Sequence, residues 1–151
     1  ENTTKYVVIF ALKTKELGAD GLMLLPSMRY RADDREVVTY FKAVGNATDL
    51  PILIYNNPVD YSVFVSVDMF DELKDCPTIV AVKESTRDLT NIPGKKNKFG
   101  DRFHILGGVD TISLESLVVG ADGWVFGLVD AFPNETVTMY NHAVNGDYNK
   151  A

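Results

Sequence analysis

The run Thr78-Ile-Val-Ala-Val-Lys83-Glu-Ser-Thr86 is an apolar stretch of strand length that ends in a lysine and then turns polar. Because side chains alternate between the two faces of a strand, we expect Ile79 and Ala81 to share the face of Lys83, with the two valines opposite. The small Ala81 below the lysine leaves room for a ligand. Lys83 is therefore the first candidate functional residue.

Short apolar runs and helical segments alternate along the rest of the chain. Several helical segments begin at capping residues, as at Asn2-Thr3-Thr4, the Asp33–Glu36 capping pattern and Ser66, and the second is expected to close at Gly45. Strict alternation of helix and strand predicts a parallel sheet, and strands that are apolar throughout are expected to be buried on both faces. The other predicted strands are 21–26, 51–55, 103–108 and 123–128, and the predicted helices are 6–17, 34–44, 66–73, 111–119 and 134–144.

One segment fits this pattern badly. Residues 87–98 should form a helix by position, but Pro93-Gly94 in the middle argues against a regular one. The run Lys95-Lys96-Asn97-Lys98 in the same segment is expected to be solvated surface. It is too short for a nucleic-acid patch.

A four-residue repeat supports a regular helix–strand unit. Gly18-Ala-Asp-Gly21 and Gly120-Ala-Asp-Gly123 are identical, and each joins a helix that ends on glycine to an apolar strand. No G-x-G-x-x-G or Walker sequence follows a strand, so nothing marks an open nucleotide-binding sheet. Polar or small residues instead follow several successive strands, which is typical of a barrel active site.

The sequence thus predicts an α/β fold of the (β/α)8 TIM-barrel type. Such a barrel usually takes about 250 residues, whereas 151 residues supply about five strands. Residues 1–151 are therefore expected to form one partial barrel domain that contributes about the last five β/α units.

Composition limits the classes of partner. The net charge of −6 argues against nucleic acid or an anionic membrane as a partner, which leaves small molecules. The apolar runs are far shorter than the roughly 20 residues of a membrane span, and no secretory leader opens the sequence, so a cytoplasmic location is expected. No cluster has metal-ligand spacing, and neither a metal nor an organic cofactor is expected.

Two residues suggest a chemistry. Alternation places Ile52 and Ile54 outward and Tyr55 inward, so Tyr55 and Lys83 should lie at the same end of successive strands. A lysine desolvated in an apolar barrel has its ammonium form disfavoured and becomes an amine nucleophile toward a carbonyl, which gives a Schiff base. A phenol beside it can move protons.

Four motifs carry a resemblance to a known family. They are I-Y-N-N-P at 54–58, V-K-E-S-T at 82–86, L-G-G-V-D at 106–110 and G-A-D-G-W-V at 120–125. In this order and spacing the chain resembles the dihydrodipicolinate synthase and N-acetylneuraminate lyase family of class I aldolase-type barrels. The resemblance implies a Schiff-base lysine at Lys83 and a proton-relay tyrosine at Tyr55. It also implies substrate-binding residues, which are Gly108, Asp110, Val125 and Thr86.

The departures from the family pattern concern the substrate. The G-T-T-G-E stretch that binds the carboxylate of the 2-oxo acid is not in this sequence. At the position where dihydrodipicolinate synthases share an arginine, this chain has Asp60. At the position of their second relay tyrosine, it has Met28. Both changes point away from dihydrodipicolinate synthase itself.

The resemblance therefore implies a lyase or synthase that acts on pyruvate or another 2-oxo acid, by aldol cleavage or condensation, dehydration or deamination. Family members are commonly homotetramers, so a homotetramer is expected. Two alternatives stay open. The chain could be a catalytically incomplete barrel fragment that serves as a binding or structural module, or Lys83 could bind a phosphate or carboxylate without forming a covalent adduct.

Overall fold

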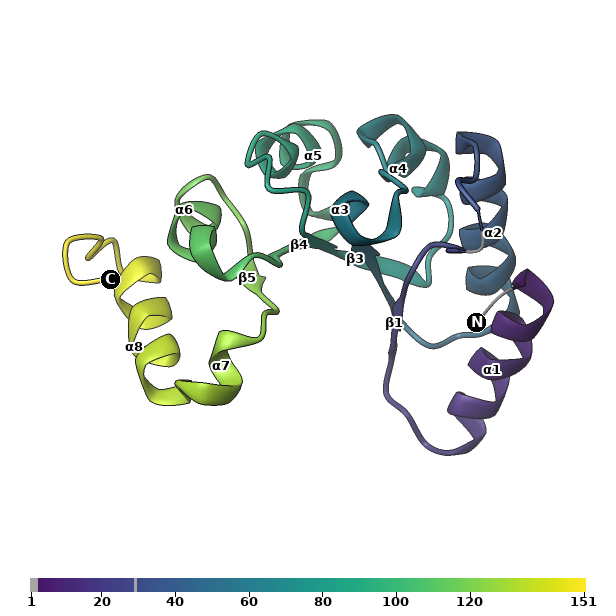
Figure 1. Ribbon diagram of the computed structural model, residues 1–151, viewed down its shortest axis with the longest axis horizontal. Coiled ribbons are helices and arrows are strands. Elements are labelled where there is room, and N and C mark those ends of the chain that lie inside the picture. The colour runs from purple at the N-terminus through teal and green to yellow at the C-terminus, as the bar shows by residue number, and fades with distance from the viewer. Residues whose placement is uncertain (1–2, 29) are drawn as a thin grey trace.

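The computed structural model describes residues 3–28 and 30–151, and Figure 1 shows one parallel sheet with helices along it. Asn2 lies outside the described residues. The strands are β1 Leu22–Leu24, β2 Ile52–Asn56, β3 Ile79–Glu84, β4 His104–Gly107 and β5 Gly123–Trp124. The helices are α1 Thr4–Glu16, α2 Asp34–Ala47, α3 Pro58–Tyr61, α4 Val67–Leu73, α5 Asn91–Phe99, α6 Ser113–Val118, α7 Leu128–Ala131 and α8 Pro133–Val144, with 3-10 turns η1 Gly100–Arg102 and η2 Asp110–Ile112.

The sheet order identifies the architecture. The five strands pair in parallel in the order β1-β2-β3-β4-β5, so each strand lies beside its neighbour in the chain. A doubly wound sheet would reverse its strand order at a switch point, whereas a barrel keeps one direction throughout. Figure 1 shows α2, α4, α5 and α6 following one another along the outer side of the sheet. The chain is thus a partial (β/α)8 barrel of five units, as the sequence predicts.

Local sequence signals fix the helix starts. Thr3 caps α1 by accepting the backbone N–H of Tyr6 at 3.4 Å. Asp33 and Glu36 form a reciprocal capping box at α2, with bonds of 2.8 and 3.0 Å. Ser66 caps α4 at 3.2 Å. These predictions are confirmed because a cap depends on residues within one turn.

The main core lies between the sheet and its outer helices. Ile52, Ile54 and Val82 point from β2 and β3 into this layer and are fully buried. Leu53, Tyr55 and Lys83 belong to the other face and are only half-buried. The helix-covered face therefore provides the packing, while the inner face is where the candidate site residues lie.

The prediction for the start of β3 is wrong. Ile79 pairs with Ile52, but Ala81 pairs with Leu53, so Val80 is an extra residue in the ladder. Such an irregularity moves the residue before it to the other face. Ile79 consequently packs in the helix-covered core rather than on the face of Ala81 and Lys83.

Burial of every strand on both faces is also wrong. Met23 in β1 is 49% exposed because it belongs to the inner face at an edge of the sheet. The strand predicted over 123–128 is only two residues long, and α7 begins at Leu128. Alternation within a strand did not reveal the exposure of Met23, since exposure depends on what covers that face of the sheet.

Gly45 and Pro93 were expected to interrupt helices, but each lies inside one. Helix α2 continues through Gly45 to Ala47, and a Cβ at Gly45 would lie 2.5 Å from the sulfur of Cys76 and 2.9 Å from Thr78 Oγ1. This glycine thus allows a close helix–strand approach. Pro93 lies in the first turn of α5, where a backbone N–H has no helical partner, so the helix is regular but begins later than position 87.

Candidate active site

Lys83 and Tyr55 lie side by side at the carboxyl ends of neighbouring strands. Tyr55 in β2 and Lys83 in β3 are register partners, and the lysine Nζ is 4.1 Å from the centre of the tyrosine ring. The ring face attracts a cation at this distance. The predicted juxtaposition of the two residues is confirmed.

Gly108, which follows β4, packs directly against the candidate lysine. A Cβ at this position would lie 2.8 Å from Lys83 Cγ and 3.0 Å from Lys83 Cε, and would clash with the Ser85 hydroxyl oxygen. Ser85 Oγ donates a hydrogen bond to the Gly108 carbonyl at 3.0 Å. The missing side chain therefore gives Lys83 its space, and Ser85 is a site neighbour that sequence reasoning did not single out.

Asp110 and Val125 lie at the ends of the next two strands. The Asp110 carboxylate accepts the backbone N–H of Leu128 at 2.6 Å, and the backbone N–H of Val125 donates to the Gly107 carbonyl at 2.8 Å. Asp110 also lines a surface hollow of about 500 Å³ together with Arg87. Asp110 thus ties the start of α7 to the loop after β4.

Thr86, another predicted binding residue, forms hydrogen bonds within the segment that follows β3. Its hydroxyl oxygen accepts hydrogen bonds from the backbone N–H of Asp88 at 3.3 Å and from Asn91 Nδ2 at 3.1 Å. These bonds shape the loop between β3 and α5. The next residue, Arg87, has a φ of 65°, a left-handed conformation that is uncommon outside glycine.

A buried ion pair lies behind the candidate lysine, on the helix-covered side of the sheet. Glu84 Oε2 and Lys95 Nζ are 2.7 Å apart, with 2% and 0% of their side chains exposed. The Asn56 amide donates to both Glu84 oxygens at 3.3 Å, and it donates to and accepts from the backbone of Val65. The expectation that Lys95 belongs to a solvated surface is wrong, because α5 turns it into the core.

This pair was missed for an identifiable reason. A buried charge requires a partner, and the partner of Lys95 is eleven residues away at the end of β3. Asn56, in the I-Y-N-N-P motif, ends β2 and is fully buried. The Lys95 position within an amphipathic α5 could have signalled burial only if the start of that helix had been known.

Tyr55 has a second polar neighbour besides Lys83. The Asn57 amide nitrogen donates to the Tyr55 hydroxyl oxygen at 3.2 Å and to an Asp60 carboxylate oxygen at 2.7 Å. The Tyr61 ring stands edge-on to the Tyr55 ring, 5.5 Å between centres. The candidate tyrosine is thus held by residues of the short helix α3 and its cap.

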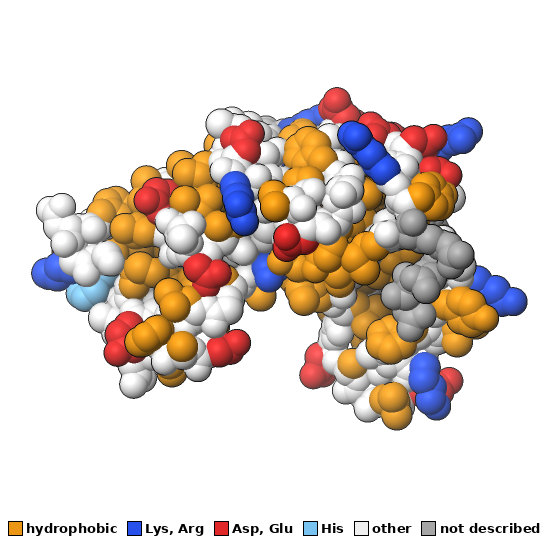
Figure 2. Space-filling model, in the orientation of Figure 1, with side chains coloured by type: hydrophobic (Ala, Val, Ile, Leu, Met, Phe, Trp, Pro, Cys, Tyr) orange, Lys and Arg blue, Asp and Glu red, His pale blue; other side chains and the backbone are white. Residues whose placement is uncertain are grey.

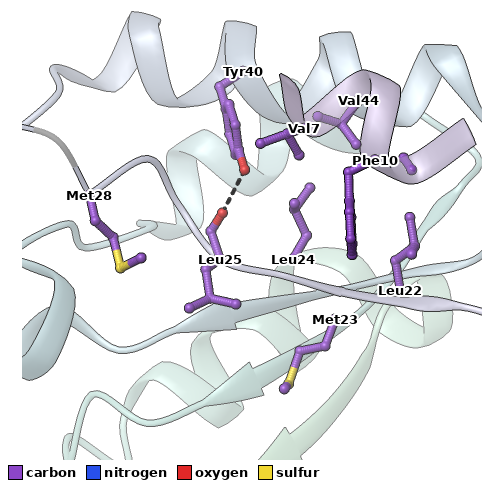
Figure 3. A pocket seen from close by; sticks show the side chains of 10 residues that line it. Val7, Phe10, Leu22, Met23, Leu24, Leu25, Met28, Tyr40 and Val44 are labelled. Carbon is purple, nitrogen blue, oxygen red and sulfur yellow. Dashed lines mark hydrogen bonds between the residues drawn. The ribbon is translucent and has the colours of Figure 1, made fainter. Parts of the chain in front are cut away.

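A separate apolar cavity of about 310 Å³ lies between α1, β1 and α2 (Figure 3). Its lining includes Met28 and Phe10, and the Tyr40 hydroxyl donates to the Leu25 carbonyl at 2.8 Å beside it. Burial raises the pKa of Tyr40 to about 12, so this phenol stays neutral. The cavity lacks the lysine–tyrosine pair and is not the candidate active site.

Figure 2 shows that the molecule is hollowed between its α7–α8 end and its α1 end, with hydrophobic side chains along the hollow.

Within residues 3–28 and 30–151, no group of three His, Cys, Asp or Glu side chains is placed to hold a metal ion. None of the helices in this part of the chain combines the length and the apolar character needed to cross a membrane.

The fold and the polar groups at the carboxyl ends of its strands define a (β/α)8-barrel protein. The chain matches the profile of the Dihydrodipicolinate synthetase family over residues 1–151, and it belongs to that family. It is 33% identical over 151 residues to the 4-hydroxy-tetrahydrodipicolinate synthase of Aquifex aeolicus, a match that covers 99% of this chain and 51% of that protein. The chain therefore spans about half the length of the relatives it matches.

Solved structures give the same result. The dihydrodipicolinate synthase from Aquifex aeolicus superimposes with a TM-score of 0.94 at 32% identity, over 99% of this chain and 52% of that one. The Ruminococcus gnavus sialic acid aldolase superimposes with a TM-score of 0.93 over 99% of this chain and 50% of that one, but at 24% identity it supports the fold alone. Membership of the resembled family is thus confirmed.

Proposed function

We propose that the protein containing this chain is a lyase or synthase that forms a Schiff base between Lys83 and the carbonyl of pyruvate or another 2-oxo acid. The observation that carries this proposal is the position of Lys83 Nζ 4.1 Å from the Tyr55 ring centre, at the carboxyl ends of neighbouring barrel strands. Membership of a family that contains a synthase relative at 33% identity supports it.

The proposed chemistry uses only the chain's own amine and phenol. The neutral Lys83 amine adds to the substrate carbonyl, a carbon–nitrogen bond forms, and one proton moves from the nitrogen to the former carbonyl oxygen to give a neutral carbinolamine. Tyr55 then gives its hydroxyl proton to that oxygen, the carbon–oxygen bond breaks, water leaves and an iminium remains. The iminium withdraws electrons from the neighbouring carbon, which permits aldol cleavage or condensation, dehydration or deamination.

We further propose that the substrate differs from that of dihydrodipicolinate synthase. Asp60, at the position of the arginine in those synthases, brings a negative charge near Tyr55 through Asn57. A carboxylate on the substrate tail would be repelled there rather than bound. Met28, at the position of the second tyrosine, has no hydroxyl to contribute.

The remaining proposals concern the whole protein. Residues 1–151 would be one partial domain within a complete barrel, with Gly108, Asp110, Val125 and Thr86 around the substrate. The partner would be a small 2-oxo acid, with no nucleic acid or membrane involved and with no cofactor or metal required. Family membership supports a homotetramer in the cytoplasm.

The test is borohydride trapping with pyruvate on the full-length protein, followed by peptide mapping. We expect a reduced adduct on the peptide that contains residues 79–87, lost in Lys83→Ala and retained in the control Lys150→Ala, whose side chain is exposed. If neither pyruvate nor any of a panel of 2-oxo acids gives an adduct, the lyase proposal is wrong. The protein would then be a non-covalent binder or an incomplete barrel.

A further inference from the structure

We propose that Asn57 and Asp60 are positioning residues for Tyr55, holding an N–H donor against the phenol oxygen that loses its proton during Schiff-base formation. This inference rests on the proposed function. Both residues lie at α3, the short helix directly after β2, and Asn57 is buried. From the sequence, neither residue was given a role in proton transfer.

The orientation of the Asn57 amide follows from its own contacts. The amide oxygen accepts the backbone N–H of Asp60 at 3.3 Å, as the N-cap of α3. A backbone N–H can only donate, so the oxygen must face Asp60 N and the NH2 group must face Tyr55 and the Asp60 carboxylate. Its two hydrogens then serve the Tyr55 oxygen at 3.2 Å and Asp60 Oδ2 at 2.7 Å.

Asp60 thus holds the amide at both ends. Its backbone N–H fixes the amide oxygen, and its carboxylate fixes the amide nitrogen. The carboxylate bond is charge-assisted and therefore the stronger of the two nitrogen contacts. Rotation of the Asn57 amide away from Tyr55 would break both Asp60 contacts.

The hydrogen bond from Asn57 affects how Tyr55 can give up its proton. Because the phenol oxygen already accepts a hydrogen bond from Asn57, its own proton remains available for the hydroxyl group that leaves as water. When that proton is given, the oxygen becomes a phenolate, and the N–H that already points at it stabilises the new charge without rearrangement. The proton is returned to Tyr55 in the later steps of turnover.

The other ionisable groups around Tyr55 are compatible with this role. Lys83 lies over the ring at 4.1 Å, and Tyr61 stands edge-on at 5.5 Å. Burial, then the neighbouring Tyr55 and Asp60, raise the pKa of Tyr61, so Tyr61 remains a neutral phenol at working pH. Asp60 brings a carboxylate to the neighbourhood of Tyr55, and this carboxylate accepts a hydrogen bond from the Asn57 amide.

The test is the Asn57→Ser variant of the full-length protein. Serine keeps an oxygen that can cap α3, but it has no amide N–H and its hydroxyl is too short to reach the Tyr55 oxygen. At saturating pyruvate we expect the rate of trapped-adduct formation to fall by about 10–100-fold, somewhat less than the loss of a direct oxyanion donor, with little change in the pyruvate concentration that gives half the maximal rate. Asp60→Asn, which keeps an acceptor for the amide, should retain most of the activity, whereas Asp60→Ala should not.

A double-mutant cycle separates positioning from simple structural damage. In a Tyr55→Phe background, Asn57→Ser should cause no further loss, because no hydroxyl is left to position. Ser66→Ala, which removes the cap of the neighbouring helix α4, controls for loss of stability and should leave the rate of adduct formation unchanged.

Two outcomes would overturn the inference alone. One is a normal rate in Asn57→Ser, and the other is an equal loss with and without the Tyr55 hydroxyl, in a wild-type protein that forms the adduct. Absence of an adduct in the wild type would instead overturn the proposed function and this inference with it.

Discussion

The buried ion pair behind the candidate lysine gives the sharpest stability prediction. Lys95→Met keeps most of the side-chain volume but leaves the Glu84 carboxylate without its partner, where only 2% of that side chain is exposed. Removing one partner of a buried pair costs about 3–5 kcal/mol, because the remaining charge stays desolvated. We expect the free energy of unfolding to fall by this amount.

The same helix provides a matched control. Lys98 is also in α5 and also pairs with a carboxylate, Asp68, at 3.0 Å, but 37% and 95% of the two side chains are exposed. Surface pairs contribute about 0.2–1 kcal/mol, so Lys98→Met should change little. The comparison removes any general effect of a lysine-to-methionine change in α5.

Urea unfolding of the full-length proteins measures both effects, provided that the slope with denaturant is unchanged. A double variant, Glu84→Gln with Lys95→Met, removes both charges and leaves an oxygen for the Asn56 amide. It should recover most of the loss. The reasoning would be refuted if Lys95→Met were as stable as Lys98→Met, or if the double variant were less stable than Lys95→Met.

Two further predictions follow from single contacts. Gly108→Ala should abolish or strongly slow adduct formation with pyruvate while far-UV circular dichroism stays unchanged, because a Cβ would lie 2.8 Å from Lys83 Cγ; an adduct formed at the wild-type rate would contradict this. Burial would raise the pKa of Asp122, but hydrogen bonds from Lys96 and from the Ile105 N–H outweigh burial and hold it below its usual value. A lowered folded-state pKa contributes stability that is fully present above the unfolded value of about 3.9 and is lost as pH falls through the folded value. The difference in melting temperature between wild type and Asp122→Asn should therefore be large at neutral pH and shrink in acid, and a difference independent of pH would refute the assignment.

Residues close in sequence determined much of the fold. The caps at Thr3, Asp33 and Ser66 and the alternation in β2 were readable from the chain because each depends on a few neighbouring residues. The repeated Gly-Ala-Asp-Gly segments also behave as predicted, since both Gly18 and Gly120 have positive φ values at the ends of helices. The order of these signals was enough to predict the parallel barrel.

The pairing of Tyr55 with Lys83 was predictable for the same reason. Strand periodicity places each on the inner face, and the parallel sheet places both at one edge. The hydrogen bonds from Asn57 were not predictable, because they depend on the turn that α3 makes after the strand.

By itself, then, the sequence determined the order of helices and strands, their caps and the face on which the candidate lysine lies, because these follow from local backbone geometry and side-chain periodicity. Only the tertiary structure decided that Lys95 is buried against Glu84, that Val80 is an extra residue in its strand and that Gly45 stays inside a helix. Each of these depends on which side chains of a distant segment occupy the opposite side of the contact, and no periodicity within one segment contains that information.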